Sequence, residues 1–235
     1  MAILSKSGSR LDGVLELHRL WLEKAPGGVR ADLSGSTLAD MKLQKSNLRG
    51  AILRSVSFLE SDLSGTDFSG ADLTGADLRN ASLVRADFTG ADLSEANLQQ
   101  AWLAETSFSE ARLSQARFLK ANLRESRLFE AHCNGCDFTG ATLTNCSFHH
   151  SYIYDCNFAA TVLDGAKFLH VRCSSSRFSG ARADGPDFSS ASLLDCDFRG
   201  VHFDGAKFAG ANLSRSSFSQ ANLSASNFSE CNLSA

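Results

Sequence analysis

Residues 66–100 read TDFSG, ADLTG, ADLRN, ASLVR, ADFTG, ADLSE and ANLQQ when they are divided into blocks of five. The middle residue of every block is Leu or Phe, and the residue two positions earlier is small. The same phase runs without insertion or deletion from Ala31 to Ala235, with 41 middle positions between Leu33 and Leu233. A period of five matches neither the helical turn nor the alternation of a flat strand. The pattern instead predicts a coil that turns a corner every five residues.

The positions of phenylalanine indicate how many sides each coil has. The chain contains 17 Phe, and 15 of them are middle residues whose position number ends in 8. Leu fills most middle positions that end in 3, so the chemical period is ten residues. A four-sided coil of 20 residues stacks Phe138, Phe158, Phe178 and Phe198 in one column. A dry interior favours Phe, because a buried Tyr hydroxyl or Trp N–H needs a partner.

The blocks ADLSG, TDFSG, ADLTG, ADFTG and ANLQQ resemble the pentapeptide repeat family, whose pattern is A(D/N)LXX. The resemblance covers residues 31–235 and implies an all-β fold, a right-handed quadrilateral β-helix. The 41 blocks correspond to about ten four-sided coils. Since each coil contacts only its neighbours, stability is expected to come from stacking.

Residues 1–30 do not follow the repeat and are predicted to form an N-terminal capping segment. Apolar residues such as Leu11, Val14 and Leu15 indicate a helix at about 10–24, which Pro26 and the two following glycines end. A helix here would cover the exposed edge of the first coil, which would otherwise favour aggregation. A helix that binds a partner is the alternative.

The C-terminal end shows no comparable helix, because the repeat stops at CNLSA. The last coil is therefore expected to present apolar middle residues at an open end. This end could dimerise, the chain could be a fragment of a longer protein, or the last block could fold over the end. Dimerisation at this end is common in the resembling family, which favours an end-to-end homodimer. The candidate dimer end comprises Leu213, Phe218, Leu223, Phe228 and Leu233.

The composition argues against several classes of protein. The 23 basic and 26 acidic residues give a net charge of −3, which does not favour direct nucleic-acid binding. No run of about 18 apolar residues is present, so no membrane span is predicted. The first residues lack the apolar segment of a signal peptide. Seven cysteines without such a segment suggest reduced thiols and a cytoplasmic location.

No catalytic pattern is recognisable, and no cofactor or metal is expected. The glycine-rich phosphate-binding motifs and the nucleophile motif of hydrolases are absent. Cys133 and Cys136 have the C-x-x-C spacing of redox and zinc sites. The repeat phase turns both inward, so we interpret them as small apolar core residues. A filled solenoid offers no substrate pocket, and the chain is predicted not to be an enzyme.

Acidic residues concentrate in one band along the chain. Residues 61–110 contain nine acidic and two basic side chains, a net charge of −7. The band either meets a basic partner, or reflects the preference of the family for Asp before the middle position. The candidate acidic interaction band comprises Asp62, Asp67, Asp72, Asp77, Asp87 and Asp92.

Residues 149–155, HHSYIYD, form the most distinctive surface stretch and contain both tyrosines of the chain. The repeat phase places four of these side chains on the outside. Ordinary variation of an outer surface is the alternative to a binding site. The candidate surface patch comprises His149, His150, Tyr152 and Tyr154.

The favoured function is a non-enzymatic scaffold that presents its outer faces to a protein partner of unknown identity. The resemblance implies a first alternative, because some family members mimic DNA and protect type II DNA topoisomerases such as gyrase from inhibitors. Acid confined to one band and the lack of a loop between coils argue against it. A second alternative, also found in the family, is a secretion- or membrane-associated effector or adaptor.

Overall fold

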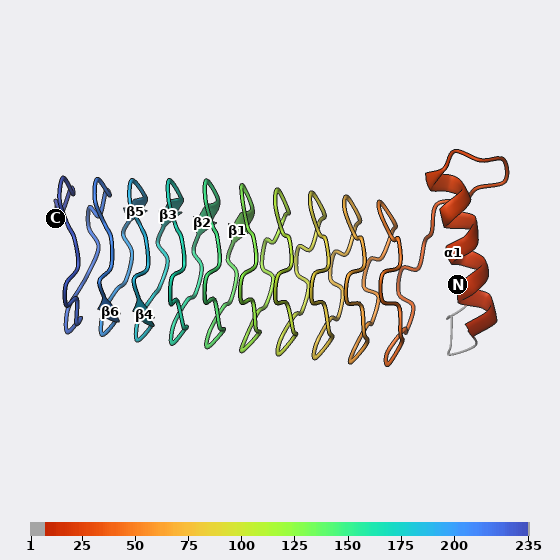
Figure 1. Cartoon of the computed structure of the whole chain (residues 1–235), viewed down its shortest axis with the longest axis horizontal. Coiled ribbons are helices and arrows are strands. Elements are labelled where there is room, and N and C mark those ends of the chain that lie inside the picture. The colour runs from red at the N-terminus through yellow and green to blue at the C-terminus, as the bar shows by residue number, and fades with distance from the viewer. Residues whose placement is uncertain (1–7, 235) are drawn as a thin grey trace.

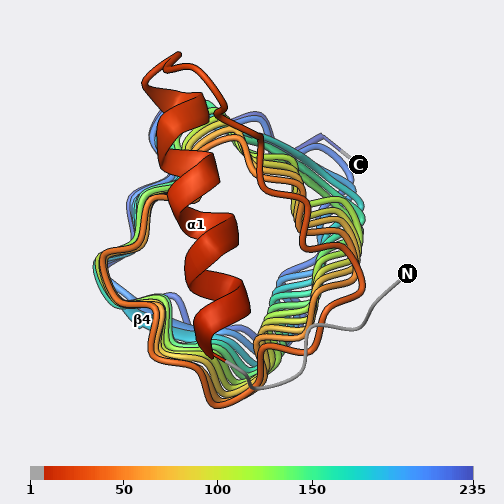
Figure 2. The same cartoon turned by 90° about the vertical axis from the view of Figure 1, so that its right-hand side faces the viewer.

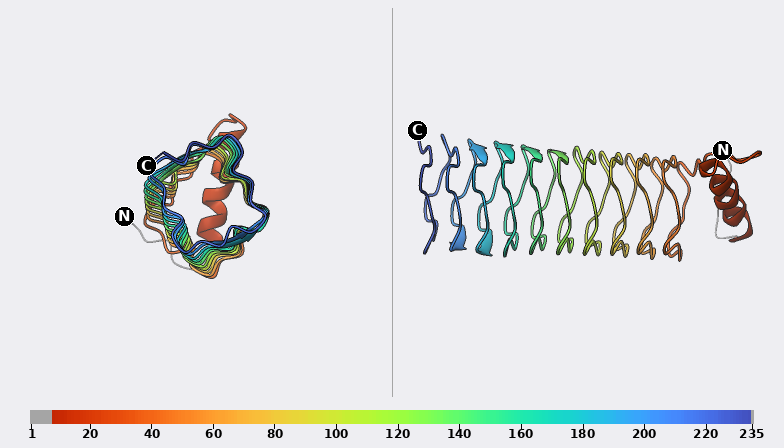
Figure 3. Two further views of the ribbon diagram at one scale, coloured as in Figure 1. Left: turned by 90° about the vertical axis from the view of Figure 1, so that its left-hand side faces the viewer. Right: turned by 45° about the horizontal axis from the view of Figure 1, so that its top comes forward.

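The computed structural model describes residues 8–234 of the chain. Helix α1 (Gly8–Leu22) lies at one end of a long stack of coils, and the C-terminus lies at the other end (Figure 1). Viewed along the stack, successive coils follow a common outline and α1 lies across the end of the stack (Figure 2, and from the opposite end in Figure 3). The sequence predicts this helix at about 10–24, and the observed helix begins and ends two residues earlier.

Parallel β-bridges show that each coil contains 20 residues. Asp32 pairs with Ile52, Ile52 with Asp72, and the same register continues to Asn232. Each pairing rests on backbone hydrogen bonds, such as the 2.8 Å bond from the Leu33 N–H to the Ile52 carbonyl. Equivalent ladders begin at Thr37, Lys42 and Asn47. The predicted four-sided coil is therefore confirmed.

The sides are short, so only a few segments form regular strands. Strands β1 (His132–Asn134), β2 (Tyr152–Tyr154), β3 (Arg172–Ser174) and β5 (Ser192–Leu194) form a parallel sheet on one side. On the opposite side, β4 (Arg182–Asp184) pairs with β6 (His202–Asp204). In each strand the middle residue is buried and its two neighbours point outward. This geometry separates the core from a surface of stacked side chains.

Stacked phenylalanine rings fill the interior. The ring of Phe158 lies 4.8 Å from those of Phe138 and Phe178, measured between centroids, and is nearly parallel to both. Its edge contacts Phe148 and Phe168 at 5.9 and 6.0 Å. All five rings are fully buried. Two Phe columns thus pack against each other along the core, as the ten-residue period predicts.

Several cysteines occupy the positions of small residues near the corners, where they make the same hydrogen bond as serine. The hydroxyl of Ser61 donates to the Leu38 carbonyl of the preceding coil at 2.7 Å, and the thiol of Cys146 donates to the Leu123 carbonyl in the same way. Burial raises the pKa of Cys146, so it stays a thiol. Cys133 and Cys136 are both buried, as predicted. Among residues 8–234, no group of three or more metal-ligating side chains is suited to a metal ion.

Helix α1 caps the first coil through buried contacts. Leu11 is buried, and His18 is fully buried with its Nδ1 accepting the backbone N–H of Ala31 at 3.1 Å. Burial lowers the pKa of His18, which favours the neutral imidazole that this hydrogen bond requires. The Val29 N–H donates to the Leu17 carbonyl, so the segment after α1 folds back along it. No helix within residues 8–234 is long and apolar enough to cross a membrane.

Candidate functional site

The residue before each middle position points outward and stacks on its equivalent in the next coil. Two of the four ladders carry Tyr152 and four of the six residues of the acidic band. The Tyr152 ladder runs through Asp72, Asp92, Arg112, His132, Tyr152, Arg172 and Ser192. The Asp87 ladder runs through Asp67, Asp87, Ser107, Arg127, Ser147, Lys167, Asp187 and Lys207.

The acidic band does not form one surface, because its six carboxylates are distributed over all four sides. Asp72 and Asp92 belong to the Tyr152 ladder, and Asp67 and Asp87 belong to the Asp87 ladder. Asp62 and Asp77 lie on the two remaining ladders. The charge that accumulates along the chain is thus spread around the circumference of the coils.

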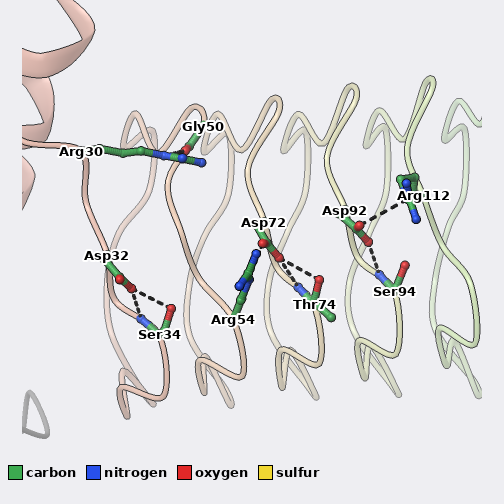
Figure 4. Close-up of polar contacts among 10 residues, drawn as sticks. All are labelled: Arg30, Asp32, Ser34, Gly50, Arg54, Asp72, Thr74, Asp92, Ser94 and Arg112. Carbon is green, nitrogen blue, oxygen red and sulfur yellow. Dashed lines mark hydrogen bonds and ion pairs between the residues drawn. The ribbon is translucent and has the colours of Figure 1, made fainter. Parts of the chain in front are cut away.

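Arginines neutralise part of this band. Asp72 pairs with Arg54, and Asp92 lies 3.3 Å from the Nε of Arg112 (Figure 4). Asp77 pairs with Arg79, and this ion pair holds the pKa of Asp77 below its ordinary value. Asp62, Asp67 and Asp87 are different, since none of them makes an ion pair with a residue between positions 8 and 234. They are the negative charges of the band without an ion pair, and all three are half-buried.

The aspartates also hydrogen-bond the turns at the corners of the coils. Oδ1 of Asp87 accepts the backbone N–H of Thr89 at 2.9 Å and also the Thr89 hydroxyl. Asp32 binds Ser34 in the same way, shown in Figure 4. Asn212 repeats the arrangement with Ser214, although it carries no charge. The side chain therefore orders the turn at the corner, and an amide serves as well as a carboxylate.

This role predicts different effects for two substitutions at Asp87. Asp87→Asn keeps the acceptor oxygen, so the free energy of unfolding is expected to change by less than about 0.5 kcal/mol. Asp87→Ala removes the acceptor from two donors, and we expect a loss of about 1–2 kcal/mol. Urea denaturation of both variants measures the difference. Equal losses would show that the charge of Asp87, and not its hydrogen bonds, stabilises the fold.

The Tyr152 ladder carries a stack of aromatic and cationic side chains. The ring of Tyr152 lies 4.7 Å from that of His132, with an angle of 4° between the planes. On its other face, the guanidinium of Arg172 lies 5.5 Å from the ring centroid. Such cation–π contacts are favourable, and Arg172 makes no ion pair with any described residue. The guanidinium thus keeps its donors available.

A second stack runs beside the first at the corner of the coils. His150 lies 5.2 Å from His170, with nearly parallel rings, and the edge of Phe129 contacts His150. The two stacks border a hollow of about 480 Å³ that is also lined by Glu130, Ser190 and Ser192. We call this combination of two stacks and a hollow the His–Tyr–Arg surface, defined by His132, His150, Tyr152, His170 and Arg172.

The structure brings together only half of the predicted surface patch. His150 and Tyr152 line the hollow. His149 turns to the neighbouring side, where it hydrogen-bonds the Ser147 hydroxyl, and burial together with Lys167 lowers its pKa. Tyr154 lies at the other end of β2. Sequence reasoning missed Phe129, His132, His170 and Arg172. Writing the sequence in rows of 20 places His132 and Arg172 directly above and below Tyr152, His170 directly below His150, and Phe129 diagonally above His150.

The candidate dimer end is only partly apolar surface. Leu213 is buried, while Phe218, Leu223 and Phe228 are half-buried and the exposed fraction of Leu233 is 58%. The end therefore carries apolar side chains that are partly exposed.

Family models for pentapeptide repeats match residues 31–70, 71–109, 91–128, 106–145 and 121–158, and a model of a pentapeptide repeat region matches residues 151–228. The chain belongs to the pentapeptide repeat family. No curated protein sequence is similar enough to this pentapeptide repeat protein to count as a match.

Two solved pentapeptide repeat structures share the fold. HetL, involved in the regulation of heterocyst differentiation in the cyanobacterium Nostoc, is 22% identical with a TM-score of 0.58, over 92% of this chain and 94% of HetL. Trypsin-treated QnrB1, a plasmid-mediated fluoroquinolone resistance protein, is 19% identical with a TM-score of 0.57, over 80% of this chain and 89% of QnrB1. The TM-scores show that the fold is shared. At identities this low the function of these relatives does not transfer, so the function of this chain has to be argued from its own surface.

Proposed function

We propose that this pentapeptide repeat protein is a non-enzymatic scaffold that binds a partner protein through the His–Tyr–Arg surface. The observation that carries the proposal is the pair of adjoining stacks, because aromatic and arginine side chains on a rigid surface are typical of protein interfaces. The interior supports the same conclusion, since its Phe columns are fully buried from Phe58 to Phe208 and fill the space a substrate would need.

The charge of this surface favours a partner with acidic groups. Arg172 has no carboxylate partner among the described residues, and its guanidinium is already held in place by Tyr152. A carboxylate from another protein could pair with it at little loss of side-chain freedom. Rigid presentation by stacked coils is the general advantage of solenoid proteins in binding.

The test uses two arginines that lie on opposite sides of the stack, Arg172 on β3 and Arg182 on β4. Proteins captured by the wild type are identified, and the affinity of each purified candidate is then measured. We expect Arg172→Ala to weaken the partner at least about tenfold and Arg182→Ala to leave it unchanged. A partner whose affinity is the same for all three proteins would place the interface elsewhere.

Mimicry of DNA toward a type II topoisomerase is a weaker candidate, supported by Asp67 and Asp87. These carboxylates are adjacent on one ladder and make no ion pair within residues 8–234. The same ladder continues with Arg127, Lys167 and Lys207, which interrupt the negative charge that a mimic of the DNA backbone requires. Protection of gyrase supercoiling from a fluoroquinolone would favour mimicry over the scaffold function.

The C-terminal coil is further proposed to join two copies end to end. Its half-buried Phe218 and Phe228 and the exposed Leu233 support this arrangement. The molecular mass in solution tests it, because a monomer at all concentrations contradicts the proposal. The seven free thiols fit a reducing compartment such as the cytoplasm.

A further inference from the structure

Both stacks of the His–Tyr–Arg surface end at the same coil. On the Tyr152 ladder, Arg172 is followed by Ser192, its partner in the register of β3 and β5. On the corner, His170 is followed 20 residues later by Ser190, and then by Gly210. The small side chains at these positions cannot continue either stack. The hollow runs beside the two columns of flat side chains and reaches the two serines at which these columns stop.

Each stack ends in a flat group. Tyr152 covers one side of the Arg172 guanidinium, and His150 covers one side of the His170 ring. Both groups line the hollow together with Ser190 and Ser192. Neighbouring rings in the two stacks lie 4.7–5.2 Å apart, so a flat group above the serines would continue the same spacing.

We propose that the hollow receives an aromatic side chain of the partner, with a neighbouring carboxylate of the same segment bound to Arg172. The inference rests on the proposed scaffold function and specifies its partner. The aromatic ring stacks on Arg172 and His170, while the hydroxyls of Ser190 and Ser192 border it. The carboxylate pairs with guanidinium donors that no described residue occupies.

The charges around the hollow favour a protein segment over a nucleic acid. Glu130 lines the side opposite to Ser190 along the corner ladder, and it would repel a chain of phosphates. One cation, Arg172, is matched by one carboxylate of the ligand. The site therefore fits an aromatic residue flanked by few acidic residues.

The test uses the full chain and three short peptides: acetyl-Glu-Trp-Glu-amide, acetyl-Lys-Trp-Lys-amide and acetyl-Glu-Ala-Glu-amide. Backbone amide shifts in nuclear magnetic resonance spectra follow each titration. We expect saturable shifts centred on Ser190 and Ser192 for the first peptide only, with a dissociation constant of about 1 mM. Shifts of equal size with the lysine or alanine peptide would overturn the inference, as would tighter binding of an oligothymidylate.

Three variants locate the site. Arg172→Ala should weaken the first peptide about tenfold, and Arg182→Ala on the opposite side should have no effect. Ser192→Tyr should place a ring next to Arg172 and fill the hollow, so that peptide binding is lost while the thermal midpoint is kept or raised. Retained peptide binding in a folded Ser192→Tyr protein would overturn the inference.

The two proposals fail separately. If a partner depends on Arg172 but tolerates Ser192→Tyr, the scaffold function stands and the hollow is not the recognition element. If the peptide binds as expected but every partner tolerates Arg172→Ala, the hollow exists and the scaffold uses another surface.

Discussion

Phe158→Ala is expected to lower the free energy of unfolding by about 3–5 kcal/mol, the largest effect of any single substitution considered for this protein. Phe158 is fully buried in the middle of the stack and contacts four other phenylalanines. The neighbouring coils are tied by backbone ladders and cannot close around the vacated space. Urea denaturation followed by circular dichroism measures the loss.

Arg177→Ala is the matched control for Phe158→Ala. Arg177 is the outward residue directly before Phe178 and is exposed. Its replacement is expected to change stability by less than about 0.5 kcal/mol. Comparable losses for the two variants would contradict the assignment of middle residues to the core.

Gly28→Ala is expected to release the segment after α1 and destabilise the cap by about 3 kcal/mol. A Cβ at position 28 would lie 2.3 Å from the backbone N of Trp21 and 2.5 Å from the carbonyl carbon of Leu20. Backbone atoms cannot rotate away as a side chain can, so Val29 has to move and its hydrogen bond to Leu17 is lost. Faster hydrogen exchange of the α1 amides would report this change.

Gly13 provides the control within the same segment. A Cβ there meets nothing within 4 Å, and the residue lies exposed in the interior of α1. Gly13→Ala is therefore expected to stabilise the helix by about 0.5–1 kcal/mol. Unchanged α1 exchange in Gly28→Ala would mean that the close packing of this segment does not hold the cap.

The core of this protein could be predicted from sequence because its rule is local. One large apolar residue per block faces inward, and the ten-residue alternation of Leu and Phe requires an even number of sides. The stack of Phe138, Phe158 and Phe178 follows directly. The position of α1 differs by two residues at each end, since helix ends depend on contacts such as that of His18 with Ala31, which sequence patterns do not reveal.

The contacts on the surface were harder to predict, because side chains that touch there are 20 residues apart in the sequence. His149 and His150 are adjacent in sequence but turn to different sides of a corner, whereas His150 and His170 are in contact. The acidic band shows the same effect. Charge counted along the chain shows in which coil a residue lies but not on which side of the coil. Such a count therefore groups Asp62, Asp72 and Asp87, which lie on different ladders.

Because each coil has four sides of five residues, every block turns the chain by a quarter of a coil. Removing one block of five residues ahead of Tyr152 would rotate everything after it by one side, so that Tyr152 would follow a different ladder. Removing 20 residues would leave every later residue on its original side of the coil and would shorten the stack by one spacing of about 4.8 Å. The position of a surface residue along the stack is therefore set by the number of whole coils before it. The side of the coil on which it lies is set by its place within its own coil of 20 residues.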